Sequence, residues 1–172
     1  METTDSDKHW YVVLTRTNSE RKVRDYFQLQ EVDTFLPVQN RVIEREGKRI
    51  ERERLLLPRM VFVHISRQEM AAVRSTLNVY DFLRDRSTGA PTSIPDAQMA
   101  DFRYMLDYSQ DQVILTGESI PKGTRVVVAK GDLQGLRGEL VRYNNKYHIL
   151  VRIDMFGSAM VTIPASYVRK EK

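Results

Sequence analysis

The sequence lacks cysteine altogether, and this absence removes several kinds of chemistry at once. Disulfides, thiolate metal sites and a cysteine nucleophile are all excluded. Only three histidines are present, His9, His64 and His148, and their wide separation along the chain does not predict a metal site. No serine–histidine–aspartate pattern and no paired carboxylates stand out. We therefore expect a binding protein that is not an enzyme and that uses no metal or other cofactor.

Long apolar runs are also missing. None approaches the roughly 18 residues that suggest a membrane span. The polar, mildly acidic segment 1–9 lacks the basic start and apolar centre of a signal peptide. These features predict a cytoplasmic protein without a membrane partner, and we expect its first few residues to be disordered.

Positive charge is unevenly distributed along the chain. The excess of four positive charges lies entirely in residues 109–172, because residues 1–108 contain equal numbers of acidic and basic side chains. A basic C-terminal module is typical of proteins that contact a polyanion or an acidic protein surface. An excess of this size also occurs in ordinary soluble basic domains, so both interpretations remain open.

The N-terminal part predicts an α+β domain. Residues 10–15 (WYVVLT) form an apolar run that is typical of a buried central strand, and Asn18 and Ser19 are N-cap residues for an amphipathic helix of about three turns. Further strands are expected at 34–42 (interrupted by Pro37), 60–65 and 79–83, and helices at 67–75 and 96–108. The order favours a mainly antiparallel sheet covered by helices.

A highly charged segment, residues 41–55, interrupts this pattern. Gly47 and the β-branched Val42, Ile43 and Ile50 favour a protruding two-stranded hairpin with Gly47 at or near its turn, and a solvated charged helix is the alternative. Its near-balanced charge favours a solubilising protrusion over a reader of nucleic-acid sequence.

The C-terminal part has a different pattern. Residues 109–119 are polar and predict a linker, whereas strands at 125–129, 139–143, 146–153 and 159–163 predict a small β-barrel. Asn144 and Asn145 suit a tight hairpin turn. The stretch 130–140 (KGDLQGLRGEL) places Gly131, Gly135 and Gly138 between two β-rich runs, which indicates positive backbone angles or closely approaching backbones. A phosphate loop is excluded, because no Lys-Ser/Thr follows and a strand comes next.

This glycine pattern resembles a KOW motif, and residues 153–157 (IDMFG) resemble a later stretch of that family, with Ser158 where arginine is usual. The N-terminal part is similar to the NGN domain that precedes KOW in NusG-type transcription elongation factors. The resemblance lies in WYVV at 10–13, the charged hairpin, and LLPRMVFV at 56–63. It implies an NGN-like RNA polymerase-binding domain at 9–108, a linker at 109–119 and a KOW β-barrel (SH3-like) at 120–172.

Two departures from the family pattern indicate which branch of the family the chain resembles. Arg59 and Met60 stand where glycine and tyrosine are usual, and the helix–hairpin surface is polar and somewhat basic. Both suggest a specialised paralogue similar to RfaH or to the UpxY-type antiterminators of capsular polysaccharide operons. A general NusG housekeeping factor and an RNA- or ribosome-binding KOW protein are the alternatives.

The resemblance implies a monomer that binds elongating RNA polymerase, holds its clamp closed and suppresses pausing and termination. By motif position, the residues that would contact the polymerase clamp helices are Leu14, Met60, Phe62, Phe82 and Ile94. Apolar strand residues also form cores, so a purely structural role is the alternative for each of them.

The resemblance also implies two further contact regions. Non-template DNA or nascent RNA would be bound by basic residues at the start of the first helix, Arg16, Arg21, Lys22 and Arg24, whose alternative role is a solvated helix face. A ribosomal protein or termination factor would bind the KOW module at Met155 and Phe156, although Phe156 equally suits the closure of the barrel.

Overall fold

The computed structural model describes residues 7–172, so the expected disorder of the residues before Asp7 lies outside the described residues. The chain divides into two compact units. Unit 1 comprises Met1–Pro37 and Leu55–Asp96, and unit 2 comprises Val38–Arg54 and Ala97–Lys172.

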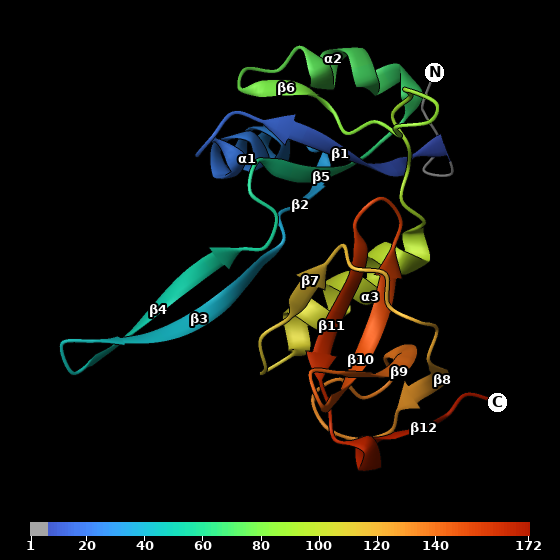
Figure 1. Ribbon diagram of the computed structural model, residues 1–172. Coiled ribbons are helices and arrows are strands. Elements are labelled where there is room, and N and C mark those ends of the chain that lie inside the picture. The colour runs from blue at the N-terminus through green and yellow to red at the C-terminus, as the bar shows by residue number, and fades with distance from the viewer. Residues whose placement is uncertain (1–6) are drawn as a thin grey trace. The chain divides into compact units, whose positions relative to one another are not determined.

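Unit 1 is a four-stranded antiparallel sheet with helices. Its strand order is β2-β5-β1-β6, formed by Asp33–Phe35, Met60–Ile65, His9–Thr15 and Val79–Phe82. The helices are α1 (Glu20–Leu29), the short 3-10 turn Arg67–Glu69 and α2 (Met70–Arg74). This arrangement confirms the buried central strand, the amphipathic first helix and the short second helix that the sequence predicts (Figure 1).

Local sequence explains how these elements begin and end. Ser66 and Glu69 form a capping box, in which the Glu69 carboxylate accepts a hydrogen bond from the Ser66 backbone N–H at 3.3 Å. Pro37 divides the predicted strand 34–42 into β2 and β3 (Val38–Arg45), because proline lacks the N–H that a continuous ladder needs. β2 lies at the edge of the sheet, as expected for a strand next to a proline.

The charged segment folds as a hairpin and not as a helix. β3 (Val38–Arg45) and β4 (Lys48–Leu55) form a two-stranded sheet of their own. Glu46 and Gly47 have φ values of 53° and 75°, which are typical of a two-residue type I′ turn. The side-chain amide of Gln39 holds the base of the hairpin: its nitrogen donates to the Asp111 carbonyl and its oxygen accepts from the Val113 N–H, both at 2.8 Å.

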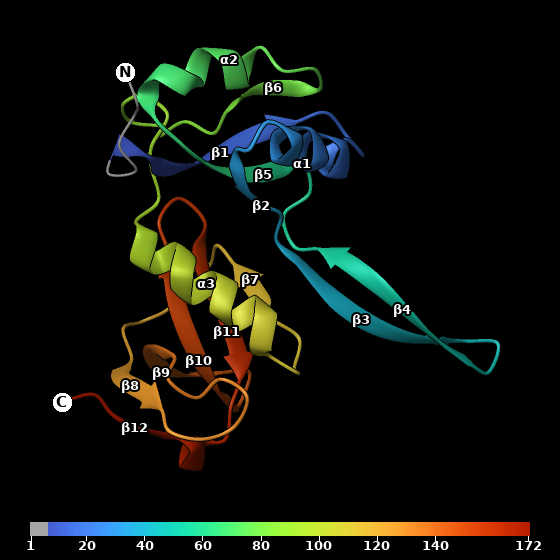
Figure 2. The same ribbon diagram turned by 180° about the vertical axis from the view of Figure 1, so that it is seen from behind.

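The remainder of unit 2 is formed by helix α3 (Asp96–Tyr108) and a six-stranded antiparallel sheet (Figure 2). Tyr104 of α3 donates a hydrogen bond to the Gln134 carbonyl at 2.6 Å, and Gln98 binds both the side chain and the backbone N–H of Asp154. The strand order of the sheet is β12-β8-β9-β10-β11-β7. In that order, the strands are Val168–Lys170, Thr124–Val128, Arg137–Tyr143, Lys146–Ile153, Gly157–Thr162 and Ile114–Thr116. A 3-10 turn at Ala165–Tyr167 precedes β12.

The turns of this sheet follow the sequence pattern closely. Asn144 and Asn145 have φ values of 49° and 63° and connect β9 to β10, as predicted. Gly135 has a φ of +93°, whereas Gly138 lies where an added Cβ would be 2.6 Å from the Leu150 carbonyl oxygen. The glycine turn therefore uses both properties that the spacing indicates, a positive φ and a close approach of two backbones.

The compact units differ from the sequence ranges proposed for the domains. Helix α3 and the charged hairpin group with the C-terminal sheet, and β7, which pairs with β11, lies inside the range predicted as a linker. The reason is that these groupings depend on long-range contacts, which polarity and periodicity along the chain do not encode. The functional assignment of the ranges 9–108, 109–119 and 120–172 stays a prediction.

Candidate functional site

An open depression of about 550 Å³ lies in unit 1 at the C-terminal end of β1 and the N-terminal ends of β5 and β6. We call it the strand-end depression. Leu14 and Met60 are direct cross-strand partners in the β1–β5 ladder, so their side chains share one face of the sheet. The depression is lined by Leu14, Thr15, Arg16, Thr17, Pro58, Arg59, Met60 and Tyr80.

A strained loop shapes one wall of the depression. Arg59 has a φ of 63°, a left-handed conformation that side chains other than glycine seldom adopt. Its N–H donates to the buried carboxylate of Glu20 at 2.9 Å, and its carbonyl accepts from the Thr15 N–H at 2.9 Å. Glycine suits this geometry without strain, and here a carboxylate from α1 and the end of β1 hold arginine in it.

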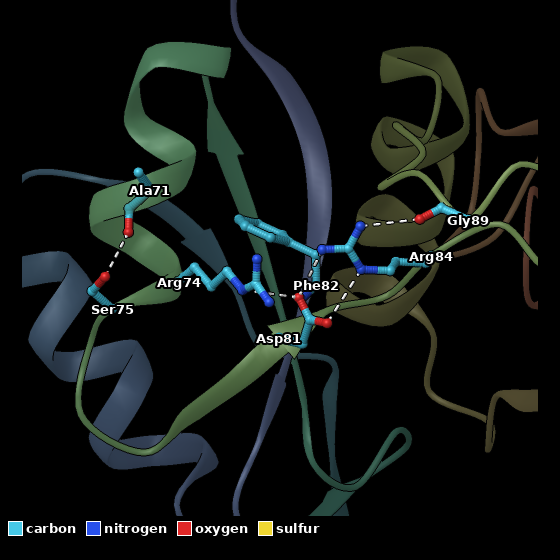
Figure 3. A network of polar contacts seen from close by, with 7 residues as sticks. All are labelled: Ala71, Arg74, Ser75, Asp81, Phe82, Arg84 and Gly89. Carbon is cyan, nitrogen blue, oxygen red and sulfur yellow. Dashed lines mark hydrogen bonds and ion pairs between the residues drawn. The ribbon is translucent and has the colours of Figure 1, made fainter.

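Tyr80 forms the opposite wall and is 77 % exposed. The following residue, Asp81, is the centre of a polar network that joins β6 to α2 and to Arg84 (Figure 3). Both of its carboxylate oxygens accept hydrogen bonds from Arg84 at 3.2 Å, and Arg74 of α2 lies 3.4 Å away. Hydrogen bonds from Arg84, aided by the Phe82 N–H and the positive charge of Arg74, lower the pKa of Asp81.

The structure brings two of the five predicted polymerase-contact residues together in the depression, Leu14 and Met60. Phe62 is two residues further along the same sheet face and is fully buried. Phe82 pairs with Val13 and therefore lies on the opposite face from Leu14. Ile94 is buried, and its N–H donates to the Trp10 carbonyl at 2.9 Å. For all five, the partner role stays a prediction.

Sequence reasoning missed Tyr80, which the structure adds to Leu14 and Met60. The strand at 79–83 was predicted, but its register against β1 includes an irregularity between Leu14 and Thr15. Because such an irregularity changes the side-chain alternation, no pattern in the sequence placed Tyr80 beside Leu14.

The four basic residues predicted to bind nucleic acid lie near the start of α1. Arg16, Arg21 and Lys22 are exposed, while Arg24 is half-buried and pairs with Asp25 at 3.0 Å. The buried residues of the helix are Glu20, Val23 and Phe27, so the basic side chains occupy its outer surface. Arg16 also lines the strand-end depression.

The predicted partner surface of the C-terminal module lies at the turn between β10 and β11. Met155 has a φ of 75° and is 36 % exposed, and the Phe156 N–H donates to the Ile153 carbonyl at 3.1 Å. Phe156 is half-buried. The partner role of both residues stays a prediction.

The chemistry available at the strand-end depression is that of binding. Its walls combine apolar side chains with Arg16 and Arg59 at the rim, which suits an apolar segment flanked by acidic groups. Across residues 7–172, no group of three or more histidine, aspartate or glutamate side chains is arranged to hold a metal ion. No helix in that range combines the length and apolarity needed to cross a membrane.

The fold of this chain resembles a solved structure of domain interaction in Thermotoga maritima NusG, with a TM-score of 0.51, 21 % sequence identity and coverage of 98 % of this chain and 100 % of that one. Chains of the MjSpt4:Spt5 complex, in conformations B and A, match with TM-scores of 0.33 and 0.31, both at 14 % identity, covering 94 % and 95 % of this chain and 95 % and 98 % of theirs. No curated protein matches the chain.

The family comparison covers more than half of the chain. Residues 8–103 match the model of the NusG family, described as transcription termination factor nusG. The matched residues include all of unit 1 that forms the strand-end depression, from Leu14 to Tyr80. This chain therefore belongs to the NusG family of transcription factors.

Proposed function

We propose that this protein is a transcription antitermination and elongation factor that binds elongating RNA polymerase through the strand-end depression. Family membership supports a role in transcription. The observation that carries the proposal is the exposed aromatic wall of Tyr80 beside the paired Leu14 and Met60, because a concave apolar surface rimmed by charge is typical of a protein partner site.

The mechanism that we propose is bridging. The clamp helices of the polymerase insert an apolar tip into the depression, while Phe62, Phe82 and Ile94 support its strands from within. The basic residues at the start of α1 contact the exposed non-template DNA or the nascent RNA. Clamp opening then has to break one of these contacts, so pausing and termination are suppressed.

We further propose that the protein acts in the cytoplasm as a monomer on a specific operon of the capsular polysaccharide type. The departures at Arg59 and Met60 support a specialised member of the family, since both residues line the depression. The C-terminal sheet would serve as a KOW module that binds a ribosomal protein or a termination factor through Met155 and Phe156.

Polymerase binding is tested with two tyrosine variants of the full chain. Tyr80→Ala removes the wall of the depression, and Tyr26→Ala removes a tyrosine of α1 that is 48 % exposed elsewhere in unit 1. Loss of a central interface tyrosine costs about 2 kcal/mol, so we expect about thirtyfold weaker binding of the polymerase elongation complex by Tyr80→Ala only. Equal binding by both variants contradicts the proposed site.

Operon specificity is tested by run-through transcription. We expect the protein to increase run-through on the leader of an adjacent polysaccharide operon and to leave an unrelated template unchanged. An equal increase on both templates would identify a general factor. Salt-dependent RNA binding without any effect on polymerase would instead favour the ribosome- or RNA-associated alternative.

A further inference from the structure

The β3–β4 hairpin separates its charges by face. A two-residue turn at Glu46 and Gly47 pairs Arg45 with Lys48, and each further pair follows along the two strands. Cross-strand partners share a face, and alternate residues of each strand point to opposite faces. One face therefore carries five cations and no carboxylate: Arg41, Arg45, Lys48, Arg52 and Arg54.

The opposite face has the other sign. It carries three carboxylates and a single cation: Glu44, Glu51, Glu53 and Arg49. The burial of the isoleucines agrees with this register, because Ile43 and Ile50 are both half-buried and would be partners on the basic face, while their neighbours along each strand are exposed. The total charge of the segment is thus nearly balanced, although one face of the hairpin is basic and the other is acidic.

The five cations are available to a partner. All five are exposed, and no ion pair joins any of them to a carboxylate anywhere in the part of the chain that the structure describes. Eight residues of a strand extend over about 26 Å, which is long enough to follow several phosphates of a duplex. The hydrogen bonds of Gln39 to Asp111 and Val113 fix the base from which this face extends.

We propose that the basic face of the hairpin binds the phosphate backbone of a nucleic-acid duplex. A two-stranded β-ribbon fits the major groove of B-DNA, which is about 12 Å wide. Residues 38–55 contain no aromatic side chain on which an unpaired base could stack, so a duplex is favoured over a single strand. Binding rests on phosphate contacts and is therefore independent of base sequence. This inference does not rest on the proposed polymerase contact.

The test uses the full chain and a fluorescently labelled 24-base-pair DNA duplex of arbitrary sequence, with an RNA duplex and a single strand of the same length as further arms. With five phosphate contacts, affinity for the DNA duplex falls by about 500-fold between about 50 and 200 mM salt. The single strand binds more weakly than the duplexes. The stronger of the two duplex arms identifies whether DNA or RNA is the natural source of the phosphates.

Two single variants on one strand provide the decisive comparison. Arg52→Gln removes a cation from the basic face, and Arg49→Gln removes one from the acidic face, so both lower the net charge equally. We expect Arg52→Gln to reduce the slope of log affinity against log salt by about 0.9 and Arg49→Gln to leave it unchanged. Equal effects of the two variants would show that overall charge alone is responsible, and would overturn the inference.

Two other results would also overturn it. One is a chain that binds polymerase but neither duplex, which leaves the proposed function intact. The other is weaker binding of Arg52→Gln to polymerase free of nucleic acid, with duplex affinity unchanged, which would assign the basic face to an acidic protein surface. Conversely, duplex binding that depends on Arg52 supports the inference even in a chain that fails to bind polymerase.

Discussion

Replacing Phe82 with alanine removes a buried ring from the face of the unit 1 sheet that lies opposite Leu14. Phe82 is 3 % exposed, pairs with Val13 across the β1–β6 ladder, and lies edge-on to Tyr11 with the ring centroids 6.2 Å apart. Truncation of a buried phenylalanine to alanine costs about 3–5 kcal/mol, because apolar contacts are lost and a cavity remains. We expect a loss of this size for Phe82→Ala, which lowers the melting temperature of unit 1 by about 15–30 °C.

The single tryptophan makes this loss measurable in the intact chain. Trp10 belongs to β1, is 6 % exposed and lies with its ring 5.0 Å from the His64 ring, so its fluorescence reports the unfolding of unit 1 alone. Urea titration monitored at this residue gives the free energy of unfolding. The control is Tyr80→Ala, which changes a residue that lies two positions before Phe82 and is 77 % exposed. We expect it to change the free energy of unfolding by less than about 0.5 kcal/mol.

The two possible roles of Phe82 give opposite results. If Phe82 belongs to the core, Phe82→Ala lowers the free energy of unfolding, and any loss of polymerase binding follows from unfolding. If Phe82 forms the partner surface, Phe82→Ala weakens polymerase binding while the free energy of unfolding stays near that of the original chain. A change below about 1 kcal/mol for Phe82→Ala would refute the assignment of this residue to the core of unit 1.

Two predictions concern the C-terminal sheet. Hydrogen bonds from Arg152 at 2.8 and 3.0 Å lower the pKa of Glu139 from its ordinary 4.5, so the pair stabilises unit 2 above about pH 4.5 and this contribution is lost as the pH falls through the lowered value. Urea unfolding by circular dichroism should show this acid-dependent loss in the original chain and not in Glu139→Gln, and an unchanged pH profile would contradict it. Gly138→Ala should lower the free energy of unfolding by more than about 2 kcal/mol, because its Cβ would meet the Leu150 carbonyl. Gly135→Ala, which has free space around its Cβ but a φ of +93°, should lower it by about 1–2 kcal/mol in the same assay. A larger loss for Gly135→Ala than for Gly138→Ala would contradict the close approach of the two backbones at Gly138.

Elements were predictable from the sequence wherever the signal was local. Apolar runs located β1 and β5, Pro37 marked the break between β2 and β3, and Gly47 marked the hairpin turn. These features depend on neighbours along the chain, whose propensities and periodicity are readable directly. Local consistency of this kind explains why helix α3 was found with its observed bounds.

Features that depend on register or on distant contacts were not predictable in the same way. Tyr80 lines the strand-end depression because of the irregularity after Leu14. Phe82 does not line it, because its ladder partner is Val13, on the opposite face from Leu14. The grouping of α3 with the C-terminal sheet depends on contacts such as that of Tyr104 with Gln134. The two-faced hairpin was readable in principle, since strand alternation separates the charges that a count over the whole segment combines.

The hydrogen bonds of Gln39 also set an order of events during synthesis. The hairpin leaves the ribosome roughly sixty residues before Val113 does, which corresponds to about 3–12 s at ordinary rates of translation. A two-stranded hairpin by itself is marginally stable in water. The hairpin is therefore anchored late, when Asp111 and Val113 have been synthesised and their backbone groups form hydrogen bonds with the Gln39 side chain. Until then, its five cations lie on a fluctuating pair of strands in an incomplete chain.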